Sequence, residues 1–529
     1  MKYKNIAAAA LILFMAGCVK DSFNLNKLKK TEYNPTVAAP LVFTSLTLDQ
    51  ILKQNESDLI NVDGDGFISL IYRSSLFSST AEDLIIISDQ SYSQTVSPGL
   101  GPAPLPNGNT LNYPETQTLT FAAAPNQLDS IMLKGGSLDI TSNSGFDATL
   151  DIIMTIPGAT IGGIPFSQTI NIAANSSDNS SFSLSNYKFD LTNGGTNTNE
   201  FQVVFDLTLT GNGGTINTTD QLDIDLTISN LQFSKLFGVV DISNIAPQED
   251  TVAITLFNSA SGIGDFTIFN PEVRLYTENS FGTTIEASFN RMEGINTISG
   301  VTYDLSVSGA LPTPWTISGP SYSQMGQTID DSLIINGSDI VDMINDQPKF
   351  FVYDIGASTP SAASQLFVLD TSSIKFDAEI ELPMHGTIKN FTMIDTVGLD
   401  LGMDAVVDLT LTTRIRNGFP LEFDITFYSL EWDDVNKVYN LTDSAYTGSN
   451  ILVAESGAID GNGRVTTQVE TQTDIVMNET QTRNFANASR MIIKAVASTS
   501  NNGTTNVKFY NDYELEFKIG AIAEVLTEF

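Results

Sequence analysis

The stretch RNGFPLEFDITF, residues 416–427, begins with a polar turn and continues as alternating apolar and polar residues. Phe419, Phe423 and Phe427 recur in it at intervals of four residues. Successive side chains of a β-strand point to opposite faces, so these three rings fall on the same face. The stretch therefore predicts a tight turn that leads into a strand with one buried face.

The same pattern occurs at two earlier places in the chain. Residues 143–154 read NSGFDATLDIIM and residues 278–289 read ENSFGTTIEASF, each with a phenylalanine after a polar turn and apolar residues four and eight positions later. The leading phenylalanines Phe146, Phe281 and Phe419 are 135 and 138 residues apart. This spacing indicates a repeat about the size of one domain.

Three more elements recur in the same order around this pattern. An alternating stretch opens each copy (TQTLTF, DTVAITL, DTVGLDL), an asparagine precedes an apolar strand (Asn186, Asn336, Asn478), and an alternating strand closes it (LDIDLTISNL, IKFDAEIELP, YELEFKIGAI). The alternative explanation is that all β-hairpins look alike. Four elements in one order, three times over, favour a true repeat.

We therefore expect an all-β protein of tandem antiparallel β-sandwich modules, three repeats of similar size, after a small mixed N-terminal region. In that region Leu48, Ile51 and Leu52 fit helical spacing, and the proline-rich residues 97–109 form a linker or an ordered turn. The predicted domains are an α+β region at 37–111 and three modules at 112–240, 241–388 and 389–529.

The N-terminus has the features of an export signal. Two lysines precede an apolar run at 6–16, which is too short to span a bilayer. Small residues then lead to Cys18, the only cysteine of the chain. This ending resembles the bacterial lipobox, although Met15 stands where that motif usually has leucine. The resemblance implies a lipoprotein signal peptide at 1–17, a lipid such as palmitate on the thiol of Cys18, and a lipidated tether at 18–36.

Two further resemblances concern the cellular address. Lys20 and Asp21 resemble the export signal of surface lipoproteins in Bacteroidota, although Ser22 stands where that signal often has a second acid. The stretch EYNPTVAAPLVFTSLTLDQIL resembles the opening of large uncharacterised Bacteroidota lipoproteins. Together they imply a chain anchored by lipid in the outer membrane and facing the cell surface, with no known activity. The hairpins NPEVRLYTENSFG and IRNGFPLEFDITFY resemble late-embryogenesis-abundant-type sandwiches, which implies a fold alone.

The charge and the scarcity of certain residues restrict the function. Lysine and arginine number 25 against 61 aspartates and glutamates, a formal net charge of −36. We expect no nucleic-acid partner, because such a surface has no excess cations to displace the counterions of phosphates. One cysteine cannot form an internal disulfide, and with the single histidine, His385, it cannot supply the usual ligands of zinc. We expect no cofactor apart from the covalent lipid.

Residues 61–72, NVDGDGFISLIY, are the best candidate for a metal site. Asn61, Asp63 and Asp65 occupy positions one, three and five of a calcium loop. Position twelve, usually a bidentate glutamate, is Tyr72. The favoured interpretation is an Asp-Gly turn before a strand, with calcium binding as the alternative.

The sequence assigns no catalytic residue. The acidic stretch with Asp433, Asp434 and Asn436 is interpreted as a hairpin turn, and Trp432 as an exposed ring at a sandwich edge or, alternatively, a sugar-stacking ring. The sequence contains no nucleophile elbow, P-loop or dinucleotide fingerprint. We expect a non-enzymatic structural or binding protein. The alternatives are a carbohydrate- or protein-binding accessory of an outer-membrane uptake or secretion complex, and a glycoside hydrolase with an unassigned acid pair.

Overall fold

Almost all regular structure of the chain is antiparallel β-strand, which confirms the predicted fold class. The computed structural model describes residues 32–47, 59–97, 99, 102–242, 245–254, 264–306, 309, 311–360, 366–399, 406–445 and 452–528. The chain divides into two compact units. Unit 1 comprises Met1–Leu48, Lys389–Thr505 and Asp512–Phe529, and unit 2 comprises Asp49–Ile388 and Asn506–Asn511.

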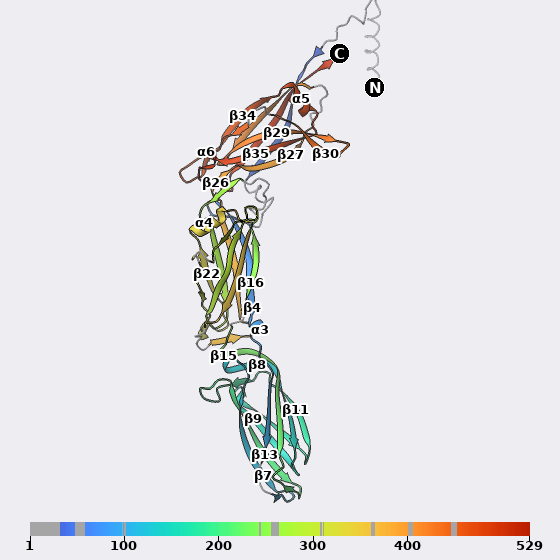
Figure 1. Cartoon of the computed structure of the whole chain (residues 1–529), viewed down its shortest axis with the longest axis vertical. Coiled ribbons are helices and arrows are strands. Elements are labelled where there is room, and N and C mark those ends of the chain that lie inside the picture. The colour runs from blue at the N-terminus through green and yellow to red at the C-terminus, as the bar shows by residue number, and fades with distance from the viewer. Residues whose placement is uncertain are drawn as a thin grey trace, which may run out of the picture. The chain divides into compact units, whose positions relative to one another are not determined.

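The described strands form three modules (Figure 1), and the same order of strand pairing recurs in each. In the first module the short strand β12 (Lys188–Asp190) pairs with both layers and joins them into one continuous sheet. We call the sheet that contains the closing strand of each repeat its front sheet. In the first module its strand order is β11 (Ser177–Ser183), β8 (Gln127–Ser144), β15 (Leu222–Val239) and β5 (Gln90–Val96). In the second it is β22 (Ile329–Ile335), β18 (Glu272–Asn279), β25 (Ser373–Pro383) and β4 (Ile68–Thr80). In the third it is β34 (Val469–Val476), β28 (Val406–Asn417), β37 (Glu514–Val525) and β2 (Thr36–Thr47).

The back sheet of each module contains the strand that follows the repeated phenylalanine. In the first module its order is β7 (Thr110–Thr120), β13 (Glu200–Gly211) and β9 (Ala148–Ile161). In the second it is β16 (Ile245–Ala253), β23 (Phe350–Ser358), β19 (Ile285–Ile295) and β20 (Thr302–Asp304). In the third it is β27 (Phe391–Gly398), β35 (Arg490–Thr499), β29 (Leu421–Asp433) and β30 (Val438–Ser444).

Among the described residues, the remaining elements are mostly short, and the longer β10 extends the back sheet of the first module beside β9. The strands are β1 (Glu32–Tyr33), β3 (Ile60–Val62), β6 (Ala103–Pro104), β10 (Ile164–Ile172), β12 (Lys188–Asp190), β14 (Thr215–Ile216), β17 (Asp265–Ile268), β21 (Trp315–Ile317), β24 (Leu366–Leu369), β26 (His385–Lys389), β31 (Leu452–Ala454), β32 (Ala458–Ile459), β33 (Val465–Thr467), β36 (Val507–Lys508) and β38 (Thr527–Glu528). The helices are α3 (Ala81–Leu84), the 3-10 turn η3 (Tyr322–Gln324), α4 (Ser338–Asn345), α5 (Glu479–Ala486) and α6 (Ser500–Gly503).

Three strands of the predicted N-terminal region, β2, β4 and β5, belong to three different sheets. They complete the front sheets of the third, second and first modules respectively. The structure thus differs from the expected separate region at 37–111 and from modules made of uninterrupted stretches. The reason is that sheet partners can be far apart in sequence, as Thr47 and Glu514 are, and a local pattern does not report the partner. The predicted helical residues 48–52 lie outside the described residues.

One buried side chain fixes the repeated turn in each module. In the third module Asn417 Oδ1 accepts a hydrogen bond from the backbone N–H of Phe419 at 2.9 Å, and its Nδ2 donates to the carbonyls of Leu421 and Glu455. Buried backbone groups need such partners. The side chain therefore holds the turn that precedes β29.

The second module repeats this arrangement, and the first keeps one of its three hydrogen bonds. Asn279 Oδ1 accepts from Phe281 N–H at 2.9 Å, and its Nδ2 donates to two carbonyls of the second module. In the first module Ser144 Oγ accepts from Phe146 N–H at 3.3 Å. The three phenylalanines are buried and precede β29, β19 and β9, which are equivalent strands.

Aromatic contacts join the two sheets of each module. In each pair the first residue lies on the front sheet. The pairs are Tyr92–Phe201 at 5.8 Å, Phe376–Trp315 at 6.2 Å and Phe517–Phe427 at 6.2 Å between ring centroids. Such pairs contribute about 0.5–1.5 kcal/mol each beyond the burial of their area. Each module is thus a sandwich whose apolar faces pack together.

Candidate functional site

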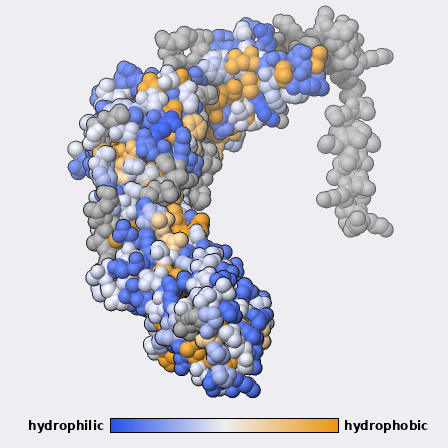
Figure 2. All heavy atoms as spheres, turned by 60° about the horizontal axis from the view of Figure 1, so that its bottom comes forward, coloured by the Kyte–Doolittle hydropathy of each residue, from blue (hydrophilic) through white to orange (hydrophobic). Residues whose placement is uncertain are grey.

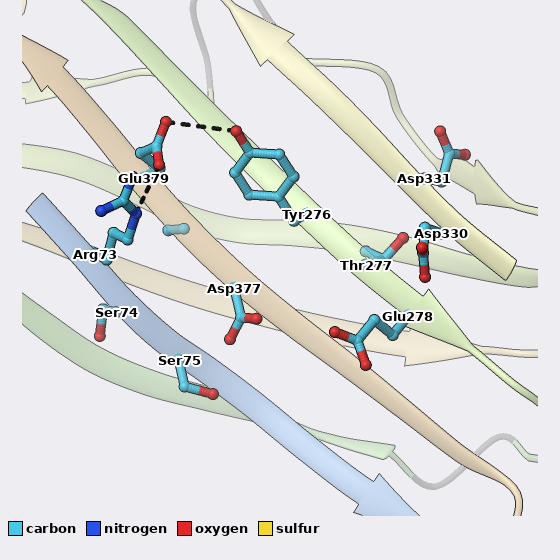
Figure 3. Close-up of a pocket in the computed structure, with 11 residues that line it drawn as sticks. Arg73, Ser74, Ser75, Tyr276, Thr277, Glu278, Asp330, Asp331, Asp377 and Glu379 are labelled. Atoms are coloured by element: carbon cyan, nitrogen blue, oxygen red, sulfur yellow. Dashed lines mark hydrogen bonds and ion pairs between the residues drawn. The ribbon is translucent and has the colours of Figure 1, made fainter. Parts of the chain in front are cut away.

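The outer face of the front sheet in the second module bears a hollow of about 620 Å³ (Figure 3). Strands β22, β18, β25 and β4 form it. On β18 the residues Val273 and Leu275 are buried, whereas Tyr276 and Glu278 are exposed, as the alternation of a strand with one buried face requires. The charged and aromatic side chains of the hollow are Arg73, Tyr276, Glu278, Asp330, Asp331, Asp377 and Glu379.

Glu379 organises one end of the hollow. This carboxylate is 7% exposed, and its Oε2 accepts a hydrogen bond from Arg73 Nε at 2.8 Å. Its Oε1 accepts from Arg274 Nη1 at 2.9 Å and from the Tyr276 hydroxyl at 3.4 Å. Figure 3 shows Arg73 and Tyr276 pointing toward it from the two neighbouring strands. A nearly buried carboxylate needs such partners. The two arginines make the short hydrogen bonds, and the Tyr276 hydroxyl adds a longer, weaker one.

The same contacts change the acidity of the groups around Glu379. Burial opposes the charge of Arg274, but hydrogen bonds with Glu379 and Glu381 hold its pKa above the usual range. Burial and the negative charge of Glu379 raise the pKa of Tyr276. The Tyr276 hydroxyl therefore keeps its proton at neutral pH and remains a hydrogen-bond donor.

The other end of the hollow is an acidic rung. Glu278 and Asp330 are direct cross-strand neighbours on β18 and β22. Side chains in such positions have Cβ atoms about 4.5–5.5 Å apart. Lys375 Nζ lies 2.6 Å from an oxygen of Asp377 and 3.7 Å from one of Glu278. This end presents several carboxylate oxygens to solvent beside one ammonium group.

The equivalent face of the third module has different chemistry. Aligning Asn279 with Asn417 places Arg414 where the second module has Tyr276. Arg414 Nε and Arg416 Nε both donate to Glu470 of β34, at 2.8 and 2.9 Å. These hydrogen bonds lower the pKa of Glu470 to about 2. A paired charge ladder thus covers the position that an aromatic ring occupies in the second module.

The residues of the predicted lipid anchor and export signal, Cys18, Lys20 and Asp21, lie outside the described residues. The anchor, the signal and the membrane address stay predictions from the sequence. Within the described part of the chain, no helix is long and apolar enough to cross a membrane.

In the calcium candidate, Asp63 and Asp65 lie in the turn between β3 and β4, and Asn61 lies in β3 itself. Asp63 Oδ1 accepts from the N–H groups of Asp65 and Phe67, both at 2.9 Å. Gly66 has a φ of 85°, a conformation that glycine adopts without a steric cost. These contacts are those of a hairpin turn, and calcium binding here stays a prediction. Among the described residues, no three His, Cys, Asp or Glu side chains are grouped to hold a metal ion.

Asp433, Asp434 and Asn436 form the turn between β29 and β30. Asp433 Oδ1 accepts from the N–H groups of Val435 and Asn436, and these and further hydrogen bonds from Asn436 lower the pKa of Asp433. Trp432 is 39% exposed and its Nε1 donates to Asp434 Oδ1 at 2.9 Å.

His385 lies in β26 and is half-buried. Its Nε2 is 3.0 Å from Nδ2 of Asn506, and its ring contacts Phe269 at 5.4 Å between centroids. Burial and the charge of Lys508 lower the pKa of His385. These neighbours are those of a packed structural histidine.

Sequence reasoning did not identify the residues of the hollow, although the strands that carry many of them can be predicted. Residues 272–278 and 375–381 each carry four polar or charged side chains at every second position, which predicts two strands with one charged face. The sequence does not show how these strands pair with each other and with β4 and β22. Only that pairing brings Arg73 to Glu379.

No family model matches the chain, and no curated protein matches it. Among solved structures it is similar to a protein from Parabacteroides distasonis provisionally described as secreted, with 10% identity, 66% of this chain and 99% of that chain covered, and a TM-score of 0.20. It is also similar to the tandem CBM22 domains of Xyn10C from Paenibacillus barcinonensis, with 9% identity, 59% and 98% covered, and a TM-score of 0.13. These scores are too low to transfer a function to this chain.

Proposed function

We propose that this chain is a lipid-anchored, non-enzymatic binding protein of the bacterial cell surface, and that the hollow of the second module binds a saccharide. The observation that carries the proposal is the position of Tyr276. Its ring lies beside Glu379 on an open sheet face, between two sets of charged hydrogen-bonding groups. A sugar ring has an apolar C–H face that suits an aromatic ring and a rim of hydroxyls that suits carboxylates and guanidinium groups.

A hydrolase is less well supported by the same hollow. Glu278 and Asp330 are near enough to form an acid pair. A general acid in glycoside hydrolysis is, however, typically enclosed by apolar groups. The Glu278 side chain is 55% exposed and ion-paired with Lys375. The surroundings favour holding a ligand over protonating one.

The lipid anchor is tested by labelling cells with palmitate. We expect the native chain to incorporate the label and the Cys18→Ser variant to lose it, since its hydroxyl is a much weaker nucleophile than the thiol. Lys20→Ala together with Asp21→Ala should keep the label but reduce digestion by protease added to intact cells. Retention of label by Cys18→Ser would contradict the anchor.

The hollow is tested by a glycan-array screen followed by calorimetry on the best ligand. Tyr276→Ala should weaken binding by at least tenfold, because it removes the ring, and Asp377→Asn should weaken it less. Arg414→Ala, the equivalent position in the third module, is the matched control and should bind like the native chain. Equal effects of Tyr276→Ala and Arg414→Ala would contradict a site in this hollow.

A further inference from the structure

The hairpin of β29 and β30 in the third module carries a cluster of exposed apolar side chains. The exposed fractions are 39% for Trp432, 88% for Val435, 47% for Val438, 37% for Tyr439 and 60% for Leu441. On the face shown in Figure 2, hydrophobic side chains lie in separate groups among polar ones. Five exposed apolar residues gathered on one short hairpin suggest an interaction site, because soluble proteins usually scatter such residues singly.

These side chains lie on both sides of the hairpin. Trp432 pairs with Tyr439, and Leu430 with Leu441, so Trp432, Tyr439 and Leu441 share one face. Val438 pairs with Asp433 and therefore points to the opposite face, and Val435 lies in the turn itself. A flat partner would cover one face and leave the other in water. A fluid medium that surrounds the tip covers all five side chains.

The polar groups of the hairpin fix how deep such a contact can be. Trp432 and Tyr439 contact each other with ring centroids 4.8 Å apart, and the Arg490 guanidinium lies 4.4 Å from the Tyr439 ring centre. Lys437 Nζ lies 3.6 Å from Asp434 Oδ1. Aromatic rings with polar atoms, next to arginine and lysine, suit the boundary between headgroups and acyl chains. The carboxylates of Asp433 and Asp434 oppose insertion beyond it.

The number of residues between Cys18 and this module limits how far the module can lie from the proposed anchor. The described part begins at Glu32, in β1, which pairs with β38 of the same unit. A fully extended chain from Cys18 to Glu32 reaches at most about 50 Å. If Cys18 carries the lipid, as the proposed function has it, this reach keeps the third module near the bilayer whatever path the tether takes.

We propose that the β29–β30 hairpin inserts its tip into the headgroup layer of the bilayer that holds the lipid anchor. The inference rests on the anchor of the proposed function and is independent of the hollow in the second module. It predicts that Trp432 contacts lipid and that Trp315, which is 7% exposed in unit 2, does not.

The two tryptophans make a direct test possible, since the chain has no others. The lipidated full-length chain is reconstituted into phosphatidylethanolamine and phosphatidylglycerol vesicles, with phosphatidylcholine brominated near the carboxyl end of its acyl chains. In the Trp315→Phe background we expect bromine to quench Trp432 and to shift its emission to shorter wavelength. In the matched Trp432→Phe background Trp315 should keep its emission. An unquenched Trp432 would overturn the inference.

A second set of variants tests the hairpin tip itself. Val435→Asp with Val438→Asp should abolish the quenching of Trp432, because each places a charge where lipid contact is proposed. Ile298→Asp is the matched control, since Ile298 is 69% exposed beyond β19 of the second module but lies in unit 2. It should leave the quenching unchanged. Because both sites are exposed, all of these variants should retain the native fold.

The outcomes separate the hairpin from the anchor. Palmitate on Cys18 with an unquenched Trp432 overturns the hairpin contact and leaves the proposed function intact. The Cys18→Ser chain is mixed with brominated vesicles, and the quenching of Trp432 is measured. Unbrominated vesicles are the control. Quenching there supports lipid contact even if Cys18 carries no lipid. A dimer in sedimentation that Val435→Asp dissociates, with no quenching by bromine, would assign the hairpin to a second copy of the chain and overturn the inference.

Discussion

Asn417 satisfies three backbone groups of the third module with one buried amide. Alanine at this position leaves the N–H of Phe419 and the carbonyls of Leu421 and Glu455 without that partner. We expect Asn417→Ala to lower the free energy of unfolding by about 3 kcal/mol. Urea denaturation followed by Trp432 emission, in the Trp315→Phe background, measures it. Ser144→Ala removes a single 3.3 Å hydrogen bond and should lower the free energy of unfolding by about 1 kcal/mol, as measured by circular dichroism. Equal losses of stability in the two variants would contradict the role of the Asn417 amide.

Glu470 makes the third module sensitive to acid. Hydrogen bonds from Arg414 and Arg416 lower its pKa from 4.5 to about 2 in the folded chain. A depressed pKa stabilises the fold above the unfolded value, and this contribution is lost as the pH falls from about 4.5 to about 2. Glu470→Gln should therefore flatten the decline of stability across this range, as measured by thermal unfolding. Glu431→Gln on β29 is the control and should leave the decline unchanged.

The residues that sequence reasoning singled out show where it succeeds. It identified Phe146, Phe281 and Phe419 because apolar periodicity reports burial. It did not identify Asn279 or Asn417, two positions earlier, as buried. A polar residue before a strand is usually an exposed turn residue, and only the surrounding carbonyls, which come from other parts of the chain, show that these are not.

At the scale of elements, the pairing of β2 with β37 can be tested covalently. Ala39 and Ala521 are direct cross-strand partners. Cysteines at both positions, in the Cys18→Ser background, should form a disulfide, because such neighbours lie within the reach of one. The oxidised chain should migrate faster in a non-reducing gel, and each single variant should not. No change in migration would contradict the assignment of β2 to the third module.

The strands themselves were largely predictable and their partners were not. Alternation identified the closing strands β15, β25 and β37, because each has one buried face. Nothing in the stretches of β2, β4 and β5 states which of three similar closing strands each will pair with. The register depends on core packing that only the whole module provides.

At the scale of the whole molecule, the two compact units should unfold separately. Each contains one tryptophan, Trp432 in unit 1 and Trp315 in unit 2. Asn279→Ala should shift the urea transition followed by Trp315 and leave that followed by Trp432 in place. Asn417→Ala should do the reverse. A common shift in both signals would show that the units unfold as one.

The repeat keeps its interior and varies its surface. Three equivalent positions show this: Tyr276 in the second module, Arg414 in the third and Thr141 in the first. The first lies in the hollow and the second pairs with Glu470. Sequence repetition therefore predicts the scaffold well and the site poorly, because the interior is under the same packing constraint in every copy and the outer face is not.

The assignment of β2, β4 and β5 to the third, second and first modules has a consequence for biogenesis. The chain is made from its N-terminus, so β2 and β5 emerge before their partners, and β4 emerges after β3 but before β25. β5 can pair with β15 first, and β4 can then pair with β25. β2 can pair only after β37 has been made. The front sheets are therefore completed in the order of the first, second and third modules, and the sheet that contains β2 is complete only after β37 has been made. A chain truncated before β37 would leave β2 unpaired, an exposed edge open to aggregation.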